Sequence, residues 1–248
     1  MCTLIILRRP EHPWPLLLAD NRDEMRDRPW DPPGRHWEDR PEVVAGRDRL
    51  AGGSWIGLND HGLACGIMNR VGSLGPDPHK RSRGELVLEA LDHAEAGEAA
   101  EALADLNPAA YQPFNLFLGD PRDGFWIRNA GGVIDIREVP SGLHMLTAHE
   151  LDDASDPRIC HFLPRFRAAT TPDPDEGDWT DWCELLASSE SIGQEEKTAA
   201  MCFQLDNGFA TLSSSLIALP AYPGMEREVV WLFNPQPRDP SGFRSVLP

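Results

Sequence analysis

Two apolar runs close to the N-terminus constrain the fold more than any other feature of the chain. They lie in TLIILRR at 3–9 and WPLLLAD at 14–20, and the turn-forming segment PEHP at 10–13 lies between them. Short apolar runs bounded by turn residues predict β-strands. A strand with apolar side chains on both faces must be covered on both faces. The sheet that holds these two strands therefore needs a packed layer above it and another below it.

Other segments predict further strands joined mainly by hairpins. The segment GGSWIGLNDHGLACGIMN at 52–69 predicts a hairpin that turns at 59–62. A meander is predicted from FNLFLGD, GFWIRNA and VIDIREV, because PRDG and GG turns link them. Additional strands are predicted at 142–148, 208–219 and 228–233. The polar, proline-rich segment 21–42 predicts a long loop, and such loops are often functional.

Helical patterns lie between these groups of strands. Apolar spacing over 84–106 predicts two helices, with Gly97 at the break between them. Asp156 and Pro157 are typical of an N-cap and a first helical position, and 178–188 predicts another helix. Strands, then helices, then strands joined by hairpins favour an α+β fold with antiparallel sheets. We expect two stacked sheets with helices outside, in one domain that spans 1–248.

Charge and composition narrow the class of protein. Forty acidic residues against 23 basic ones give a net charge of −17, which disfavours binding to nucleic acid or to anionic membranes. No apolar run approaches the roughly 20 residues of a membrane span. TLIIL is too short for a signal peptide, so a cytoplasmic location is expected. The five cysteines form no C-x-x-C pair, which favours a reducing compartment with four core thiols and one candidate nucleophile.

The candidate nucleophile is Cys2. Initiator Met is generally removed before a small residue, and its removal would leave Cys2 with a thiol and a free α-amine. The amine has a pKa near 7.7–8.0, which suits a general base for the thiol. The returning strand would bring Asp20 and Asp23 near this terminus as candidate holders of the amine. Asn21 and Arg22 are candidate donors to substrate.

Several blocks of the sequence resemble one known family. MCT at the N-terminus, LLLADNRDE at 16–24, GGSWIGLNDHG at 52–62, SRGELV at 82–87 and PFNLFLGD at 113–120 match the pattern of the NRDE-motif family. That family includes the transport and Golgi organisation protein 2 proteins. The resemblance covers most of the chain. Members have been linked to haem mobilisation (haem trafficking) and to acyl-CoA or lipid metabolism.

The NRDE-motif family is in turn similar to N-terminal nucleophile hydrolases, particularly the penicillin V acylase and bile salt hydrolase group. This resemblance implies an αββα sandwich and carbon–nitrogen amide chemistry, with Cys2 as nucleophile. It also implies that Asp23 contacts the amine and that Asn69, at the end of GLNDHGLACGIMN, donates to the oxyanion. The chain differs from the group at three places. The arginine that the group carries near the second strand is shifted to Arg22 in this chain. Ala148 replaces a polar residue of the group, and Leu212 replaces a second arginine.

Arg83 and Trp55 complete the candidate substrate-binding set with Asn21 and Arg22. Ser82 before a helix is typical of an N-cap, while Arg83 beside it could bind a carboxylate, phosphate or haem propionate. Trp55 fits either the core or an acyl pocket. The spacing of His144, His149 and the nearby aspartates fits no metal site, so neither metal nor resident cofactor is expected.

Two functions from different classes remain open. The first is an N-terminal-cysteine amidohydrolase that acts on a linear amide or acyl substrate through a thioester. The alternative is a non-catalytic carrier of haem or of acyl-CoA or lipid in the same cavity, where Cys2 could serve as an axial thiolate. A third, weaker possibility is a fold that works only through protein contacts.

Overall fold

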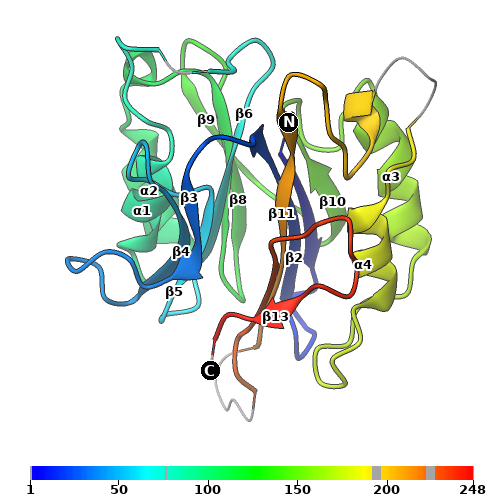
Figure 1. The fold of residues 1–248 in the computed structure, drawn as a ribbon. Helices are drawn as coiled ribbons and strands as arrows, with labels where there is room; N and C mark the ends of the chain where they lie inside the picture. The colour runs from blue at the N-terminus through cyan, green and yellow to red at the C-terminus, as the bar shows by residue number, and fades with distance from the viewer. Residues whose placement is uncertain (1, 76, 192–196, 222–226, 248) are drawn as a thin grey trace.

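Two antiparallel sheets stack between two layers of helices (Figure 1). The computed structural model describes residues 2–75, 77–191, 197–221 and 227–247. One sheet has six strands in the order β10-β1-β2-β11-β12-β13, and the other has seven in the order β3-β4-β5-β6-β7-β8-β9. The αββα sandwich predicted from the sequence is confirmed.

The first sheet contains strands from both the N-terminal and the C-terminal parts of the chain. Its strands are β1 (Thr3–Arg8), β2 (Leu16–Met25), β10 (Gly142–Leu146), β11 (Phe209–Leu219), β12 (Val230–Asn234) and β13 (Arg244–Ser245). The second sheet comes from the middle of the chain. Its strands are β3 (Trp30–Gly34), β4 (Val43–Asp48), β5 (Ile56–Asn59), β6 (Ala64–Asn69), β7 (Phe114–Gly119), β8 (Gly124–Asn129) and β9 (Ile134–Glu138).

Helices cover the outer face of each sheet. Two of them, α1 (Glu85–Leu91) and α2 (Ala96–Ala104), pack on the seven-stranded sheet. The other two, α3 (Pro157–Ala168) and α4 (Thr180–Ala187), pack on the six-stranded sheet (Figure 1). Within the described ranges, none of the helices has the length and apolar character needed to cross a membrane.

Alternation along β1 and β2 explains why both strands read as apolar throughout. Successive side chains of a strand point to opposite faces of the sheet. Leu4 and Ile6 lie in the core between the sheets, while Ile5 and Leu17 pack against the layer of α3 and α4. The same alternation continues through the polar residues at the end of β2, so the side chains of Asp20 and Arg22 point toward the other sheet.

The segment 21–42 is more regular than the long loop that the sequence predicts. Strand β2 continues to Met25, and β3 forms at 30–34 although it contains two prolines. Proline removes a backbone donor, and β3 tolerates this loss because it is the edge strand of its sheet. The helical region also differs, since α1 ends at Leu91 and Gly97 lies inside α2 instead of at the break.

Candidate active site around Cys2

Cys2 lies just before β1, at the wall of a cleft with a volume of about 840 Å³. The residue is half-buried and packs against the core between the sheets, on the same face as Leu4. The backbone N–H of Asp23 donates to the Cys2 sulfur at 3.4 Å. Pairing with β2 therefore fixes the thiol while one side of it stays open to the cleft.

This cleft, called the Cys2 cleft below, is formed where strand ends of both sheets meet the segments 51–55, 74–75 and 77–84. Its lining residues include six that the sequence predicts for the site: Cys2, Arg22, Asp23, Trp55, Asn69 and Arg83. The structure thus brings together residues from five separate stretches of the chain. A cleft of this size accommodates a drug-sized small molecule.

Asp23 is buried on the outer face of the six-stranded sheet, directly behind Cys2. Its Oδ2 lies 3.0 Å from Nη1 of Arg158, and its Oδ1 accepts a hydrogen bond of 2.7 Å from the Thr211 hydroxyl. Arg158 also donates to the Thr3 hydroxyl at 2.6 Å, next to Cys2 in the chain. This network holds a carboxylate firmly beside the start of β1.

Arg158 and Thr211 are functional neighbours that the sequence analysis did not find. Thr211 lies opposite Asp23 in the β2–β11 register. Arg158 lies on the apolar face of α3, in line with the buried Phe162 and Phe166. A charged residue at such a position is the signal that could have identified it, because an arginine buried among apolar side chains needs a partner.

Asn21 does not line the Cys2 cleft, which corrects its predicted role as a substrate donor. Strand alternation points its side chain toward the helices. Its amide donates to the carbonyls of Leu186 and Met201, both at 2.9 Å, and its Oδ1 accepts from the Ser214 hydroxyl. Asn21 therefore anchors the end of α4 and the segment near 201 to the sheet.

Asn69, the predicted oxyanion donor, closes β6, is half-buried and lines the Cys2 cleft. Within the described part of the chain, no backbone group or side chain engages its amide in a hydrogen bond. Its N–H groups are therefore available to a carbonyl oxygen bound near Cys2.

Arg22 and Trp55 form a stacked pair in the wall of the cleft. The Arg22 Cζ atom lies 4.1 Å from the Trp55 ring centroid and 5.6 Å from that of Trp30. Gly46 lies behind the indole, where an added Cβ would be 2.2 Å from the ring. Arg83 lies nearby and donates through Nη1 to the Ser73 hydroxyl at 2.9 Å and to a backbone carbonyl, that of Pro113, at 3.0 Å.

Burial, together with the negative charges of Asp23 and Asp20, raises the pKa of the Cys2 thiol to about 12. The positive amine of residue 1 and the hydrogen bond from the Asp23 backbone oppose this shift. The thiol is therefore protonated at neutral pH and needs a base. Asp20 is itself buried, and burial together with the charge of Asp23 raises the pKa of its carboxyl well above the usual range.

A first prediction follows for a chain that keeps a residue before Cys2. Alkylation of Cys2 by iodoacetamide should rise about tenfold per pH unit from pH 7 to 11, because only the thiolate reacts. Peptide mass spectrometry would measure the alkylation rate at each pH, with Cys160 as an internal reference because it is exposed on α3. This exposure corrects the prediction that Cys160 is a core thiol. A Cys2 rate that levels off below pH 9 would contradict the prediction.

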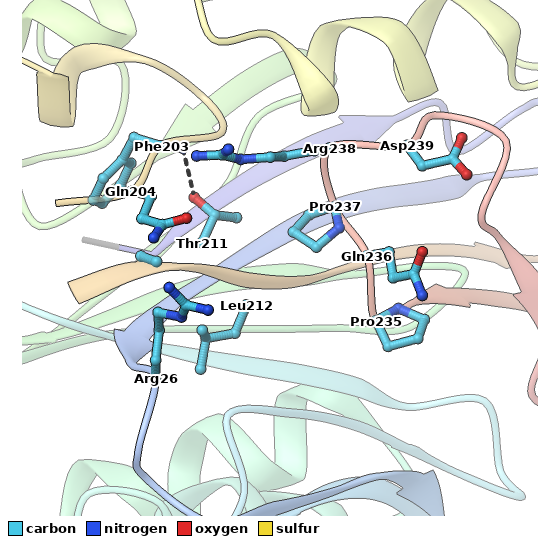
Figure 2. Close-up of a pocket in the computed structure, with 11 residues that line it drawn as sticks. Arg26, Phe203, Gln204, Thr211, Leu212, Pro235, Gln236, Pro237, Arg238 and Asp239 are labelled. Carbon is cyan, nitrogen blue, oxygen red and sulfur yellow. Dashed lines mark hydrogen bonds between the residues drawn. The ribbon is translucent and has the colours of Figure 1, made fainter. Parts of the chain in front are cut away.

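A second pocket of about 400 Å³ is lined by the start of β11 and the segment 235–239 (Figure 2). Thr211 and Leu212 line it together with Arg26 and Arg238, and the N–H of Phe203 donates to the Thr211 hydroxyl at 3.2 Å. Leu212, where the resemblance expects an arginine, therefore faces this pocket and does not line the Cys2 cleft. The described residues that line the second pocket include no thiol.

The second pocket therefore offers no nucleophile of the kind that Cys2 supplies. Elsewhere in the described ranges, no group of three or more His, Cys, Asp or Glu side chains is placed to hold a metal ion.

Comparison with known proteins places the chain in a family. The family model described as Transport and Golgi organisation 2 matches residues 1–229, so the chain belongs to this family. None of the curated proteins matches the chain significantly.

Solved structures with the same fold are N-terminal nucleophile hydrolases. The Caenorhabditis elegans N-acylethanolamine-hydrolyzing acid amidase ortholog is 12% identical with a TM-score of 0.62, over 90% of this chain and 94% of that one. Penicillin V acylase from Agrobacterium tumefaciens is 16% identical with a TM-score of 0.54, over 95% and 83%.

The C2A mutant of conjugated bile acid hydrolase from Clostridium perfringens is 13% identical with a TM-score of 0.52, over 95% and 89%. At these identities the likeness shows the fold, and it agrees with the resemblance found in the sequence.

Proposed function

We propose that this family member is an N-terminal-cysteine amidohydrolase that cleaves the carbon–nitrogen bond of a small amide through a thioester. The observation that carries the proposal is the position of Cys2, whose half-buried thiol faces a cleft of about 840 Å³ beside the anchored carboxylate of Asp23. The fold, shared with amide hydrolases, supports it.

The proposed reaction begins once Met1 has been removed. The α-amine of Cys2 accepts the thiol proton as the sulfur attacks the carbonyl carbon, and Asn69 donates to the developing oxyanion. The resulting ammonium returns the proton to the nitrogen of the leaving amine, and the carbon–nitrogen bond breaks. Water then attacks the thioester while the α-amine takes its proton, the carbon–sulfur bond breaks to release the carboxylic acid, and the ammonium returns the proton to the Cys2 sulfur. Asp23 holds the amine in position throughout.

The high pKa of the Cys2 thiol agrees with a base in the same residue. A thiol that ionised alone at neutral pH would need no amine, whereas one with a pKa near 12 reacts only if its proton moves during attack. A carrier of acyl-CoA or lipid would use the cleft without this chemistry.

Trapping of the acyl group tests the proposal. Incubation with an activated amide or a β-lactam should add the acyl mass to the N-terminal peptide of the wild-type protein and of a Cys160→Ala control. Cys2→Ala should show no adduct. If Cys2→Ala still binds haem, as read by a Soret band, or binds acyl-CoA, and wild type forms no adduct with any amide, the carrier function replaces the hydrolase.

A further inference from the structure

Arg22 is a buried cation of the Cys2 cleft without a counter-ion. Its side chain belongs to a residue that is 3% exposed, yet across the described residues no carboxylate oxygen lies within 4 Å of it. Its buried Nη1 has no hydrogen-bond partner. Burial of an unpaired charge is costly, and buried charges in proteins are normally paired. The cleft therefore holds an arginine whose natural partner is an anion from outside the chain.

Two aromatic rings lie close to the Arg22 guanidinium group. Its Cζ atom is 4.1 Å from the centroid of the Trp55 ring and 5.6 Å from that of Trp30, and the missing side chain of Gly46 leaves room for the indole. The edge carries the N–H groups, and a guanidinium edge matches a carboxylate through two parallel hydrogen bonds. A planar carboxylate fits this geometry.

The acidic residues around Arg22 do not neutralise it. Asp48 and Glu24 line the same cleft, but both lie within ion-pair distance of Arg28, at 2.7 Å and 3.6 Å. Burial favours the neutral form of Asp20. Arg83 adds a second guanidinium to the cleft, and its Nη1 bonds only to a hydroxyl and to backbone oxygens. The wall around Cys2 thus carries positive charge in a chain whose net charge is −17.

We propose that the substrate of the Cys2 cleft carries a carboxylate that the edge of Arg22 binds, as an N-acyl amino acid does. The β1–β2 register that pairs Thr3 with Asn21 continues to Cys2 opposite Arg22 on one face. Cross-strand side chains of this kind have Cβ atoms about 5 Å apart. Both side chains line the same cleft, which suits a substrate whose carboxylate lies close to its scissile carbonyl. In an N-acyl amino acid, one nitrogen and one carbon separate them.

The identity of the scissile bond rests on the proposed function, but the binding of the carboxylate does not. Calorimetry with Cys2→Ala separates the two, because this variant binds without reacting. The probes are N-octanoylglycine and N-octanoylethanolamine. They share the acyl group, but the amine part ends in a carboxylate in the first and in a hydroxyl group in the second. We expect the glycine conjugate to bind about 10- to 100-fold more tightly, as hydrogen bonds to a charged group imply.

Variants of Arg22 make the test specific. Arg22→Gln in the Cys2→Ala background should bind both probes equally. Arg22→Lys should keep part of the preference, because lysine keeps the positive charge but cannot form the two parallel hydrogen bonds of a guanidinium group. Arg26→Gln changes the net charge equally from the second pocket and should keep the full preference. Circular dichroism and thermal melting establish that each variant is folded.

Equal binding of the two probes by Cys2→Ala, no binding of either, or a preference that survives Arg22→Gln would overturn the inference. Acylation of wild-type Cys2 by a neutral amide would still support the hydrolase in that event. Conversely, a carboxylate preference without acylation would retain this inference and remove the proposed function.

Discussion

Replacement of Arg158 by methionine should lower the free energy of unfolding by about 3–5 kcal/mol, because it leaves the Asp23 carboxylate buried without its cation. The two side chains are 4% and 0% exposed, and their closest atoms are 3.0 Å apart. Arg158 also donates to the Thr3 hydroxyl at 2.6 Å and to the carbonyl of Thr198 at 2.5 Å. The substitution therefore breaks the network that ties α3 to the start of β1.

Urea unfolding of wild type and variants measures this effect. Arg165→Met is the matched control, because Arg165 lies on the same helix and pairs with Glu190 on the surface. Exposed pairs contribute little, so this control should change stability by less than about 1 kcal/mol. Adding Asp23→Asn to Arg158→Met should recover part of the loss. A loss below about 1 kcal/mol for Arg158→Met would show that the buried pair is not the anchor described above.

An N-terminal extension that survives on the purified chain should slow acylation of Cys2 by about 10²- to 10⁴-fold, the usual contribution of a general base. A Gly-Ser remnant before Cys2 converts its α-amine into an amide, which cannot accept the thiol proton. With a thiol pKa of about 12, the sulfur of the extended chain stays protonated at neutral pH.

The control for the extension is the same chain with a C-terminal tag. The two proteins should unfold at the same urea concentration, because the extension leaves the described core unchanged. Acylation is followed by mass spectrometry of the N-terminal peptide over time. Equal rates for the extended and the unextended chain would show that a group other than the α-amine is the base.

Periodicity in the sequence was enough to predict the architecture. Apolar residues on both faces of β1 and β2 require two covering layers, and hairpin spacing requires antiparallel sheets. The edge strand β3 was missed because its two prolines argue against a strand unless its place at the edge is known. The helix break after Leu91 was placed too late, since a single glycine is tolerated within a helix.

The candidate site was predictable only as far as strand position carries information. Cys2, Asn69 and Arg22 meet in one cleft because they lie at strand ends that the hairpins bring together. Asn21 was misplaced because alternate residues of a strand face opposite sides, and its neighbour Arg22 takes the cleft side. The partner of Asp23 could not be predicted from local pattern, since Arg158 is 135 residues away in the chain.

The most direct measurement is the mass of the N-terminal peptide of the native protein before and after incubation with an amide substrate. We expect a peptide that begins at Cys2 before incubation. After incubation, we expect the same peptide with its mass increased by that of the acyl group. A peptide that still begins with Met1, or an acyl group found on another residue, would contradict the claim that a freed terminal cysteine is the nucleophile.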